Sequence, residues 1–393
     1  MMVFRNRFEA IEMKVLFVCN NAFTPGNGLS ASARNTIRQL RLRGVDARLM
    51  AVRNPNPDGP QADFPLKHFK FPIFEPIIRA NGFCYAKIDR KVITQAVEWA
   101  DVVHFEEALF LENVVRKIAV AKGKACTATF HLYPHNIAAN LGMSKQSYFN
   151  KLLMRWWKHI VYHYCSDIQC PTAEVARYLQ ENDVRARLHV ISNGLQLPEK
   201  PLCPQAVVPG NPIDILCVGR LAREKSQETL LEAMRYCQNA SRIRLHFAGN
   251  GPLGKKYQKM AKRLVEEGVL HYEPVFGFYS ADELRSLAKQ SYLYIHCAWV
   301  EVEGLSCLEM TREGLVPVIG EGHLIGTSTF ALCPQSLYPV GDSQALATRI
   351  DWWIAHPDVR NRMSQEYADA ARNYDIDRSI KALTDMFEEA LKK

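Results

Sequence analysis

The sequence predicts an α/β protein built from two doubly wound parallel-sheet domains. Short apolar runs of strand length alternate with helical segments along most of the 393 residues, a pattern typical of parallel sheets covered by helices. The alternation stops at residues 196–212, where five prolines fall within seventeen residues, and it resumes afterwards. Such a stretch is typical of a connection between two domains.

This interruption sets the expected organisation of the chain. Residues 1–12 precede a methionine that could start the chain, Met13, and are consistent either with an extension of the first domain or with a short amphipathic arm. The expected parts are an N-terminal domain over residues 1–196, a linker over 197–212, a C-terminal domain over 213–360, and C-terminal helices over 361–393 that pack back towards the N-terminal domain.

The first domain begins with a strand, a loop and a helix. Residues 14–19 form an apolar run, and a polar turn containing Gly28 leads to a helix over 30–43. The turn lacks the spacing of a dinucleotide-binding fingerprint. Apolar runs and helical periodicity then predict strands at 47–51, 102–105, 125–130 and 168–170, and helices at 89–100 and 111–122.

The second domain repeats the alternation. The sequence predicts strands at 213–218, 244–248, 293–296 and 316–319, helices at 227–237, 252–266, 281–290 and 305–312, and a helical tail from Pro357.

The loop between the strand at 293–296 and the helix at 305–312 carries the strongest candidate site. A loop in this place follows the carboxyl end of a parallel strand and presents backbone N–H groups at a helix start, where anions bind. Glu301 lies in the loop and Glu309 about one turn into the helix, so both can flank one bound molecule. The two oxygens of a carboxylate suit a sugar diol. Taken alone, two glutamates at this spacing more often belong to an ordinary solvated surface than to a site.

His131 is a second candidate, because it directly follows the strand predicted at 125–130. Single histidines are more often surface or core residues than catalytic ones. The position at the carboxyl end of a parallel strand favours a role in ligand binding, since the crevices of open sheets lie there.

Charge is unevenly distributed. The net charge is +8, yet residues 1–200 carry 27 Lys/Arg against 17 Asp/Glu, and residues 113–166 contain no acidic residue. Within that stretch, residues 147–165 predict a helix with Lys151, Arg155 and Lys158 on one side and tryptophans elsewhere. This combination is typical of an interfacial membrane helix. A core helix with a solvated basic face fits as well, whereas nucleic-acid stacking is less favoured, because no nucleic-acid-binding module is recognisable.

The aromatic and basic residues at 68–87 reinforce the membrane interpretation. The eleven cysteines are scattered, odd in number and without a C-x-x-C pair, which predicts reduced thiols and a cytoplasmic protein. No apolar run approaches the length of a transmembrane helix, and no metal-binding cluster is recognisable. We therefore expect a cytoplasmic protein that is peripheral on the inner face of the membrane.

Four segments together resemble one known family. They are VGRLAREK from Val218, FAGNGP from Phe247, ISNGLQLP from Ile191, and VEVEGLSCLEM with EGLVPVIG around residues 300–320. In this order they are similar to the retaining glycosyltransferases of the GT-B fold, the group 1 or family 4-like enzymes that include glycolipid synthases. The resemblance covers nearly the whole chain from Met13 and implies two Rossmann-like domains facing each other across a cleft.

The resemblance also implies roles for single residues. Arg220 and Lys225 would bind the donor diphosphate, Glu301 would lie near the sugar, and His131 over the sugar. The remaining implied donor-binding residues are Gly28, Gly249, Val275, Phe276, Gly304, Leu305, Ser306 and Glu309. The usual Glu-Gly-Phe-Gly reads Glu303-Gly304-Leu305-Ser306 here, so the family pattern leaves open whether Glu301 or Glu303 meets the sugar.

These roles imply a retaining hexosyltransferase that uses a nucleotide-diphosphate sugar, expected to be a UDP-hexose, with no cofactor or metal. The favoured acceptor is a membrane lipid such as diacylglycerol or ceramide, reached from an anionic membrane surface by the N-terminal domain. The alternatives are an enzyme acting on a capsule, lipopolysaccharide or soluble acceptor, and a noncatalytic nucleotide-sugar-binding or membrane scaffold protein.

Overall fold

The computed structural model describes residues 13–24, 28–73, 75–80, 83–140, 143, 147–198 and 209–392. The expected extension at 1–12 and most of the expected linker lie outside the described residues. The chain divides into two compact units. The N-terminal unit comprises Met1–Pro134, Ser147–Asn193 and Asp377–Lys393, and the C-terminal unit comprises His135–Gln146 and Gly194–Ile376.

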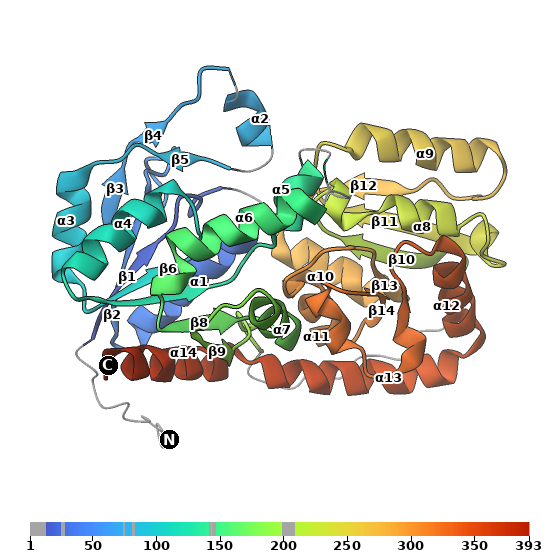
Figure 1. The fold of residues 1–393 in the computed structure, drawn as a ribbon. Coiled ribbons are helices and arrows are strands. Elements are labelled where there is room, and N and C mark those ends of the chain that lie inside the picture. The colour runs from blue at the N-terminus through green and yellow to red at the C-terminus, as the bar shows by residue number, and fades with distance from the viewer. Residues whose placement is uncertain are drawn as a thin grey trace. The chain divides into compact units, whose positions relative to one another are not determined.

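The described residues of the N-terminal unit form a seven-stranded parallel sheet in the order β3-β2-β1-β6-β7-β8-β9 (Figure 1). Its strands are β1 (Lys14–Val18), β2 (Asp46–Val52), β3 (Phe64–Leu66), β6 (Val102–Phe105), β7 (Ala125–Thr129), β8 (Asp167–Cys170) and β9 (Arg187–Val190). Strands β1 and β6 are buried over most of their length, which explains their nearly continuous apolar sequences.

Helices and one hairpin complete the N-terminal unit. The helices are α1 (Gly28–Leu42), α2 (Glu75–Ala80), α3 (Arg90–Trp99), α4 (Phe110–Ala121), α6 (Ser147–Ile160), α7 (Ala173–Glu181), α14 (Ile376–Leu391) and the 3-10 turn η1 (Tyr162–Tyr164). The hairpin pairs β4 (His68–Phe69) with β5 (Tyr85–Ala86) in antiparallel fashion. Helix α14 packs into this unit through Phe387, whose ring contacts those of Phe17 and His104.

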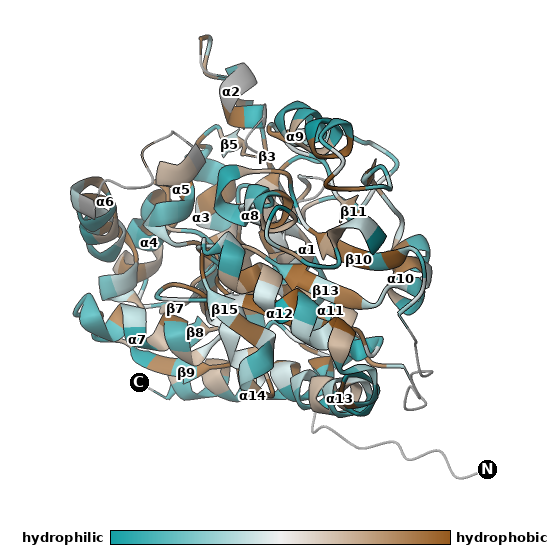
Figure 2. Ribbon diagram, turned by 90° about the vertical axis from the view of Figure 1, so that its right-hand side faces the viewer, coloured by the Kyte–Doolittle hydropathy of each residue, from teal (hydrophilic) through white to brown (hydrophobic). Residues whose placement is uncertain are grey.

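The described residues of the C-terminal unit form a six-stranded parallel sheet in the order β12-β11-β10-β13-β14-β15. Its strands are β10 (Ile213–Val218), β11 (Ile243–Ala248), β12 (Val275–Gly277), β13 (Leu293–His296), β14 (Val316–Glu321) and β15 (Leu337–Pro339). Figure 2 shows β10 and β13 in the brown of apolar residues. Their buried side chains Ile215, Leu293 and Ile295 form the centre of one hydrophobic core.

Helices surround this second sheet. The α-helices are α5 (Pro134–Asn140), α8 (Glu228–Ala233), α9 (Gly254–Glu266), α10 (Ala281–Gln290), α11 (Leu305–Arg312), α12 (Ser343–Ala355) and α13 (Pro357–Ala370). The 3-10 turns are η2 (Arg223–Lys225), η3 (Ala240–Arg242), η4 (Gly326–Phe330), η5 (Pro334–Ser336) and η6 (Ala371–Tyr374).

Helix α9 shows why the helical pattern was recognisable. It buries Tyr257, Ala261 and Leu264, spaced at one helical face, and is largely hydrophilic elsewhere (Figure 2). No helix in the described part of the chain combines the length and the apolar character needed to cross a membrane.

The two parallel sheets confirm the predicted fold class of doubly wound α/β domains. Helices α10 and α11 and strand β13 have the predicted bounds. The short strands β9, β12 and β15 were not predicted. They lie at sheet edges, where strands are only partly buried and their apolar runs are short, as the half-exposed residues of β9 illustrate.

The structure corrects the predicted faces of helix α6. Trp157 is only 2% exposed and belongs to the core. Lys158 donates a hydrogen bond to the carbonyl oxygen of Asn182 at 2.7 Å. The exposed basic residues of this helix are therefore Lys151 and Arg155, because the helix turns Lys158 towards the protein.

Candidate functional site

The C-terminal sheet has a topological switch point between β10 and β13. From β10 the chain proceeds to β11 and β12 on one side, and then crosses to β13 on the other side. Ligand crevices of open parallel sheets lie at the carboxyl ends of the strands on either side of such a point. The loop after β10 carries Arg220 and Lys225, and the loop after β13 carries Glu301. The predicted residues of these two loops therefore meet where the topology predicts a ligand.

Lys225 and Glu301 form an ion pair across these two loops, from Nζ to Oε2. Both side chains are largely buried, with 24% and 15% of their surface exposed. Burial alone would raise the pKa of Glu301, but the charge of Lys225 and a hydrogen bond from His296 outweigh it and lower this pKa to about 2. Glu301 is therefore a carboxylate at neutral pH, held against a cation.

A buried histidine that the sequence did not single out lies behind Glu301. His296 Nε2 lies 3.5 Å from Glu301 Oε2 and 3.4 Å from the hydroxyl of Thr327. Its Nδ1 lies 3.0 Å from the hydroxyl of Tyr294. Burial lowers the pKa of His296, so the ring is neutral at pH 7. A tyrosine O–H donating to Nδ1 places the ring proton on Nε2, which then donates towards Glu301.

Arg220 lies in the same loop as Lys225 and is oriented by its surroundings. Its Nη2 lies 2.6 Å from Glu224 Oε1, and its carbonyl oxygen accepts a hydrogen bond from Gln227 Nε2 at 2.9 Å. The backbone N–H of Trp299, which follows β13, donates to the carbonyl oxygen of Glu224 at 3.1 Å. The loops after β10 and β13 are thus joined through their backbones as well as through the ion pair.

Gly249 allows close contact between the loops after β10 and β11. It adopts a φ of +154°, and a Cβ there would lie 2.1 Å from the carbonyl oxygen of Gly219. Its N–H donates to the carbonyl oxygen of Gly277 at 2.7 Å. Of the neighbouring candidates on β12, Phe276 stacks on Phe247 with ring centroids 4.8 Å apart, whereas Val275 is 38% exposed.

Gly304 begins helix α11 in the left-handed conformation, with φ +81°. A Cβ at this position would lie 2.4 Å from the hydroxyl oxygen of Thr327. The next residues, Leu305 and Ser306, form the first turn of the helix and place their backbone N–H groups at its start. The Ser306 hydroxyl lies 3.2 Å from that of Tyr294, which links the helix start to the His296 network.

The two other glutamates of this segment have different environments. Burial raises the pKa of Glu309, although the charge of Arg312 opposes this. Glu303 is only 3% exposed, and its carbonyl oxygen accepts a hydrogen bond from the hydroxyl of Thr327. Lys225 pairs with Glu301, so Glu301 is the glutamate that the structure joins to the loop after β10.

In the N-terminal unit, His131 follows β7 and lies beside a glutamate that was not predicted. His131 Nε2 lies 2.5 Å from Glu106 Oε2, and these side chains are 6% and 2% exposed. Burial acts to raise the pKa of Glu106, but the charge of His131 and its hydrogen bond outweigh it, so this pKa is lowered. Glu106 follows β6 directly, next to the switch point between β1 and β6.

Two asparagines after β1 tie this region together. The Asn20 N–H donates to Glu107 at 2.6 Å, and the Asn20 amide donates to Glu112 at 2.9 Å. The side-chain oxygens of Asn20 and Asn21 accept hydrogen bonds from the hairpin, at Ala86 N and Cys84 N. Gly28 begins α1, and a Cβ there would have no atom within 4 Å among the described residues. Steric contact therefore does not require a glycine at this position.

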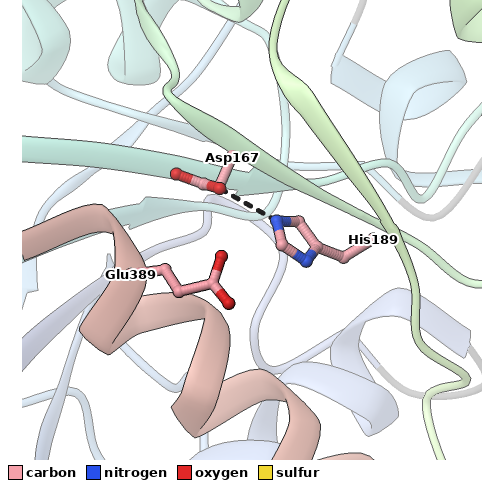
Figure 3. Close-up of side chains that lie close together, drawn as sticks. All are labelled: Asp167, His189 and Glu389. Atoms are coloured by element: carbon pink, nitrogen blue, oxygen red, sulfur yellow. Dashed lines mark hydrogen bonds and ion pairs between the residues drawn. The ribbon is translucent and has the colours of Figure 1, made fainter.

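Three side chains in the N-terminal unit have ligand types suited to a metal. Potential ligand atoms of Asp167, His189 and Glu389 lie within 4.8 Å of one another. Figure 3 shows these three side chains close together. However, Arg187 Nε donates to Asp167 at 2.7 Å, and its Nη1 lies 3.3 Å from Glu389. The guanidinium thus already supplies a positive charge to both carboxylates.

The C-terminal unit repeats most of this cluster. There Asp214 lies 2.6 Å from both Arg244 Nε and His246 Nε2. Asp167 is the first residue of β8 and Asp214 is the second residue of β10, and each pairs in register with the arginine of a neighbouring Arg-Leu-His strand. A feature that recurs in both sheets is explained by strand pairing and does not require a metal.

Two protein-family models match the chain, Glycosyltransferase Family 4 over residues 26–197 and glycosyl transferases group 1 over residues 203–369. Among solved structures, the chain is similar to Anabaena HepE in complex with UDP and glucose, with 16% identity, a TM-score of 0.73, and coverage of 96% of this chain and 100% of that chain. It is similar to sucrose-phosphate synthase from Thermosynechococcus elongatus, with 17% identity, a TM-score of 0.72, and coverage of 96% and 99%.

The catalytic domain of cholesterol-α-glucosyltransferase from Helicobacter pylori is 37% identical over 42% of this chain and 99% of that chain, with a TM-score of 0.39. A comparison with curated protein sequences gives no match. The likenesses to HepE and sucrose-phosphate synthase show a shared fold.

The close contact at Gly304 predicts the effect of a Gly304→Ala substitution. The added methyl group meets Thr327, so we expect Gly304→Ala to lower the free energy of unfolding by about 1–3 kcal/mol more than Gly341→Ala does. Gly341 is a matched control, because its φ is +82° and a Cβ there would have no atom within 4 Å among the described residues. Urea unfolding of both variants measures the difference. Equal losses would show that the approach of Thr327 is unimportant.

The Lys225–Glu301 pair predicts a specific dependence of stability on pH. The pKa of Glu301 is lower in the folded protein than in an unfolded chain, so its stabilising contribution is present above about pH 4.3 and is lost as pH falls towards about 2. Between pH 5 and 3, the free energy of unfolding should therefore fall more steeply for the native protein than for Glu301→Gln. Urea unfolding at several pH values measures both slopes.

Glu309→Gln serves as a control, because the pH dependence of stability expected from Glu309 has the opposite sign. Because the folded-state pKa of Glu309 is raised, its contribution to the free energy of unfolding is lost as pH rises. The native protein should thus lose stability relative to Glu309→Gln when pH increases from 4 to 6. Identical slopes for the native protein and Glu301→Gln would contradict the depressed pKa of Glu301.

Proposed function

Because this chain belongs to the GT-B glycosyltransferases, we propose that it transfers a hexose from a UDP-sugar to an acceptor hydroxyl with retention, forming an α-glycoside. The observation that carries this proposal is the Lys225–Glu301 pair at the switch point of the C-terminal sheet. It places a cation suited to a diphosphate beside a carboxylate suited to sugar hydroxyls. The structure of HepE with UDP-glucose supports a donor of this class.

The reaction removes a nucleoside diphosphate, which gains negative charge as its bond to the sugar C1 breaks. In the proposed mechanism Arg220 and Lys225 stabilise that charge, and the N–H groups at the start of α11 contribute further donors. The acceptor oxygen attacks C1 from the same face, and its proton passes to the departing phosphate oxygen. Two fixed cations in these positions support a reaction that needs no divalent metal.

The proposed residues divide between the two ends of the donor. Lys225 has three N–H donors, so it can bind a phosphate oxygen while it remains paired with Glu301. Glu301 is proposed to accept hydrogen bonds from the sugar, and Glu309 from the ribose. Gly249, Val275 and Phe276 are proposed to line the nucleotide end, and His131 with Gly28 to lie on the sugar side.

The first prediction from this proposal is turnover that does not depend on metal. UDP-hexoses incubated with a panel of lipid and soluble acceptors should give an α-linked product, in the presence of EDTA. Glu309→Ala should lose most of this turnover while circular dichroism shows a folded protein. Activity that EDTA abolishes and only Mg²⁺ restores would refute the metal-free mechanism. A protein that binds UDP-sugar but gives no product with any acceptor would indicate a noncatalytic scaffold.

Lys225→Ala should weaken binding of UDP far more than binding of uridine. A charge-assisted phosphate contact contributes about 1.5–3 kcal/mol, so the affinity for UDP should fall about tenfold to a hundredfold. Isothermal titration calorimetry with UDP and uridine measures the difference. The double variant Lys225→Ala/Glu301→Gln separates lost attraction from repulsion by an uncompensated carboxylate. Unchanged affinity for UDP would remove Lys225 from the site.

For the acceptor we favour a membrane lipid, such as diacylglycerol or ceramide. In the N-terminal unit, the α6 residues Tyr148 and Leu152 are 78% and 54% exposed. Phe110 of α4 is 63% exposed, and its ring contacts that of Trp156 at 5.5 Å. We call these four residues, with the exposed Lys151 and Arg155, the α4–α6 surface. Apolar and basic side chains together suit an anionic bilayer.

The hairpin and its flanking residues add a second exposed group. Phe69 and Ile73 are 43% and 79% exposed. Lys67, Lys70 and Lys87 near them are exposed as well. Each basic residue near an anionic surface contributes about 1 kcal/mol, which gives reversible and salt-sensitive attachment. The proposed location is therefore the cytoplasmic face of the membrane, with peripheral attachment.

Vesicle binding tests the α4–α6 surface. The native protein should cosediment with vesicles that contain anionic lipid at low salt, and Lys151→Ala/Arg155→Ala should bind at least tenfold more weakly, as expected for the loss of two surface charges. Lys255→Ala/Lys259→Ala removes the same charge from exposed positions of α9 in the C-terminal unit and should bind like the native protein. If the native protein does not bind these vesicles, a soluble, capsular or lipopolysaccharide acceptor becomes the better proposal.

A further inference from the structure

Glu106 lies at the switch point of the N-terminal sheet, where its carboxylate forms a hydrogen bond with His131. Glu106 directly follows β6, and His131 follows the neighbouring strand β7 by two residues. The strands are paired in parallel with Phe105 opposite Ala128. The topology therefore brings both side chains to the edge of the sheet where a ligand crevice is expected.

Of the two histidines near Glu106, His131 is the closer partner. Its Oε2 lies 2.5 Å from His131 Nε2. Nε2 of the other nearby histidine, His104, lies 3.9 Å from Glu106 Oε1. The two ring nitrogens of His104, Nδ1 and Nε2, lie 2.9 and 2.8 Å from the hydroxyls of Thr127 and Thr129. His104 is therefore held by its threonines, and the short contact of Glu106 is with His131.

We propose that Glu106 is a positioning residue that fixes the ring of His131, with Nε2–H towards the sheet and Nδ1 as the nitrogen that contacts a hydroxyl of the bound sugar or acceptor. The identity of that ligand rests on the function proposed above. The orientation of the ring does not, because it follows from a carboxylate that can only accept a hydrogen bond from Nε2.

The proposed contact between His131 Nδ1 and a ligand hydroxyl can form with either a neutral or a cationic ring. In the neutral ring the proton resides on Nε2, and the Nδ1 lone pair accepts a hydrogen bond from a hydroxyl. In the cationic ring Nδ1 also bears a proton and donates to the oxygen of the same hydroxyl. A hydroxyl group is both a donor and an acceptor, so it suits this nitrogen in either state.

The competing explanation is that the contact only satisfies a buried carboxylate. On that explanation, loss of Glu106 would lower stability, but it would not change the ring nitrogen that carries the proton or weaken ligand binding selectively. The tautomer of His131 and the kinetics of a double-mutant cycle distinguish the two.

The first experiment is long-range ¹H–¹⁵N NMR on protein with ¹⁵N-labelled histidine. His131→Ala identifies the His131 signals among those of the twelve histidines. In the native protein we expect a protonated Nε2, with its proton slowed in exchange by the short hydrogen bond. Glu106→Ala should lose that slowed proton and give a mixture of tautomers, whereas Glu106→Gln, whose amide oxygen still accepts, should keep Nε2 protonated.

Glu112→Gln is the matched control. Glu112 is a buried carboxyl of the same unit whose oxygens accept hydrogen bonds from the Asn20 amide and the Leu109 N–H, so the variant changes a buried carboxyl outside the Glu106–His131 contact. This variant should leave the His131 signals unchanged. A native Nδ1–H tautomer, or a Glu106→Ala spectrum identical to the native one, overturns the proposal whether or not the protein turns over a sugar donor.

The second experiment uses the acceptor and donor that give product. Glu106→Ala should lower kcat/KM about tenfold or more, and Glu106→Gln should restore part of it. In a His131→Ala background, Glu106→Ala should have less than a twofold effect, because the positioned ring is gone. Full additivity of the two substitutions would overturn the proposal. Absence of turnover in the native protein would instead refute the proposed function and leave the NMR result to decide the role of Glu106.

Discussion

A carboxylate buried against a cation is the interaction on which the C-terminal site depends. Glu301 is largely enclosed, and a charged group in such a place is costly unless an opposite charge and hydrogen bonds compensate for it. Lys225 supplies the charge from the loop after β10, and His296 supplies a donor from β13. The ion pair therefore joins residues that are 76 positions apart in sequence but follow strands that are neighbours in the sheet.

The backbone around this pair is equally constrained. Gly249 brings the loop after β11 against Gly219, and Gly304 brings the start of α11 against Thr327. At both places a Cβ would overlap its neighbour, so the close approach depends on the absence of a side chain. The Thr327 hydroxyl also donates to the Glu303 carbonyl oxygen. The loop that carries Glu301 is thus held from both sides, which is the preorganisation that recognition of a charged ligand requires.

The fold followed from patterns that lie close together in the sequence. The apolar run of β13 and the periodicity of α11 sufficed to place both elements. The position of Glu301 in the loop between them made it a candidate, which the resemblance to a family supported. Partners across strands were not predictable in this way: His296 and Glu106 stand within buried runs, and burial alone does not tell a ligand-facing residue from a core residue. The predicted faces of helix α6 were wrong for a related reason. Periodicity indicated an amphipathic helix, but only packing shows that Lys158 reaches a carbonyl oxygen and that Trp157 is part of the core.

Each switch point holds a glutamate beside a histidine, and the two sites differ in the group that balances the charge of the carboxylate. In the C-terminal unit the charge of Glu301 is balanced by Lys225, and the neutral His296 lies 3.5 Å from the same carboxylate oxygen. In the N-terminal unit the pKa of Glu106 is lowered by His131 and, to a smaller extent, by His104. There the balancing group is itself a histidine. A carboxylate next to an ammonium group can still accept hydrogen bonds from hydroxyls, whereas a carboxylate next to an imidazole can fix the ring so that its other nitrogen contacts a hydroxyl.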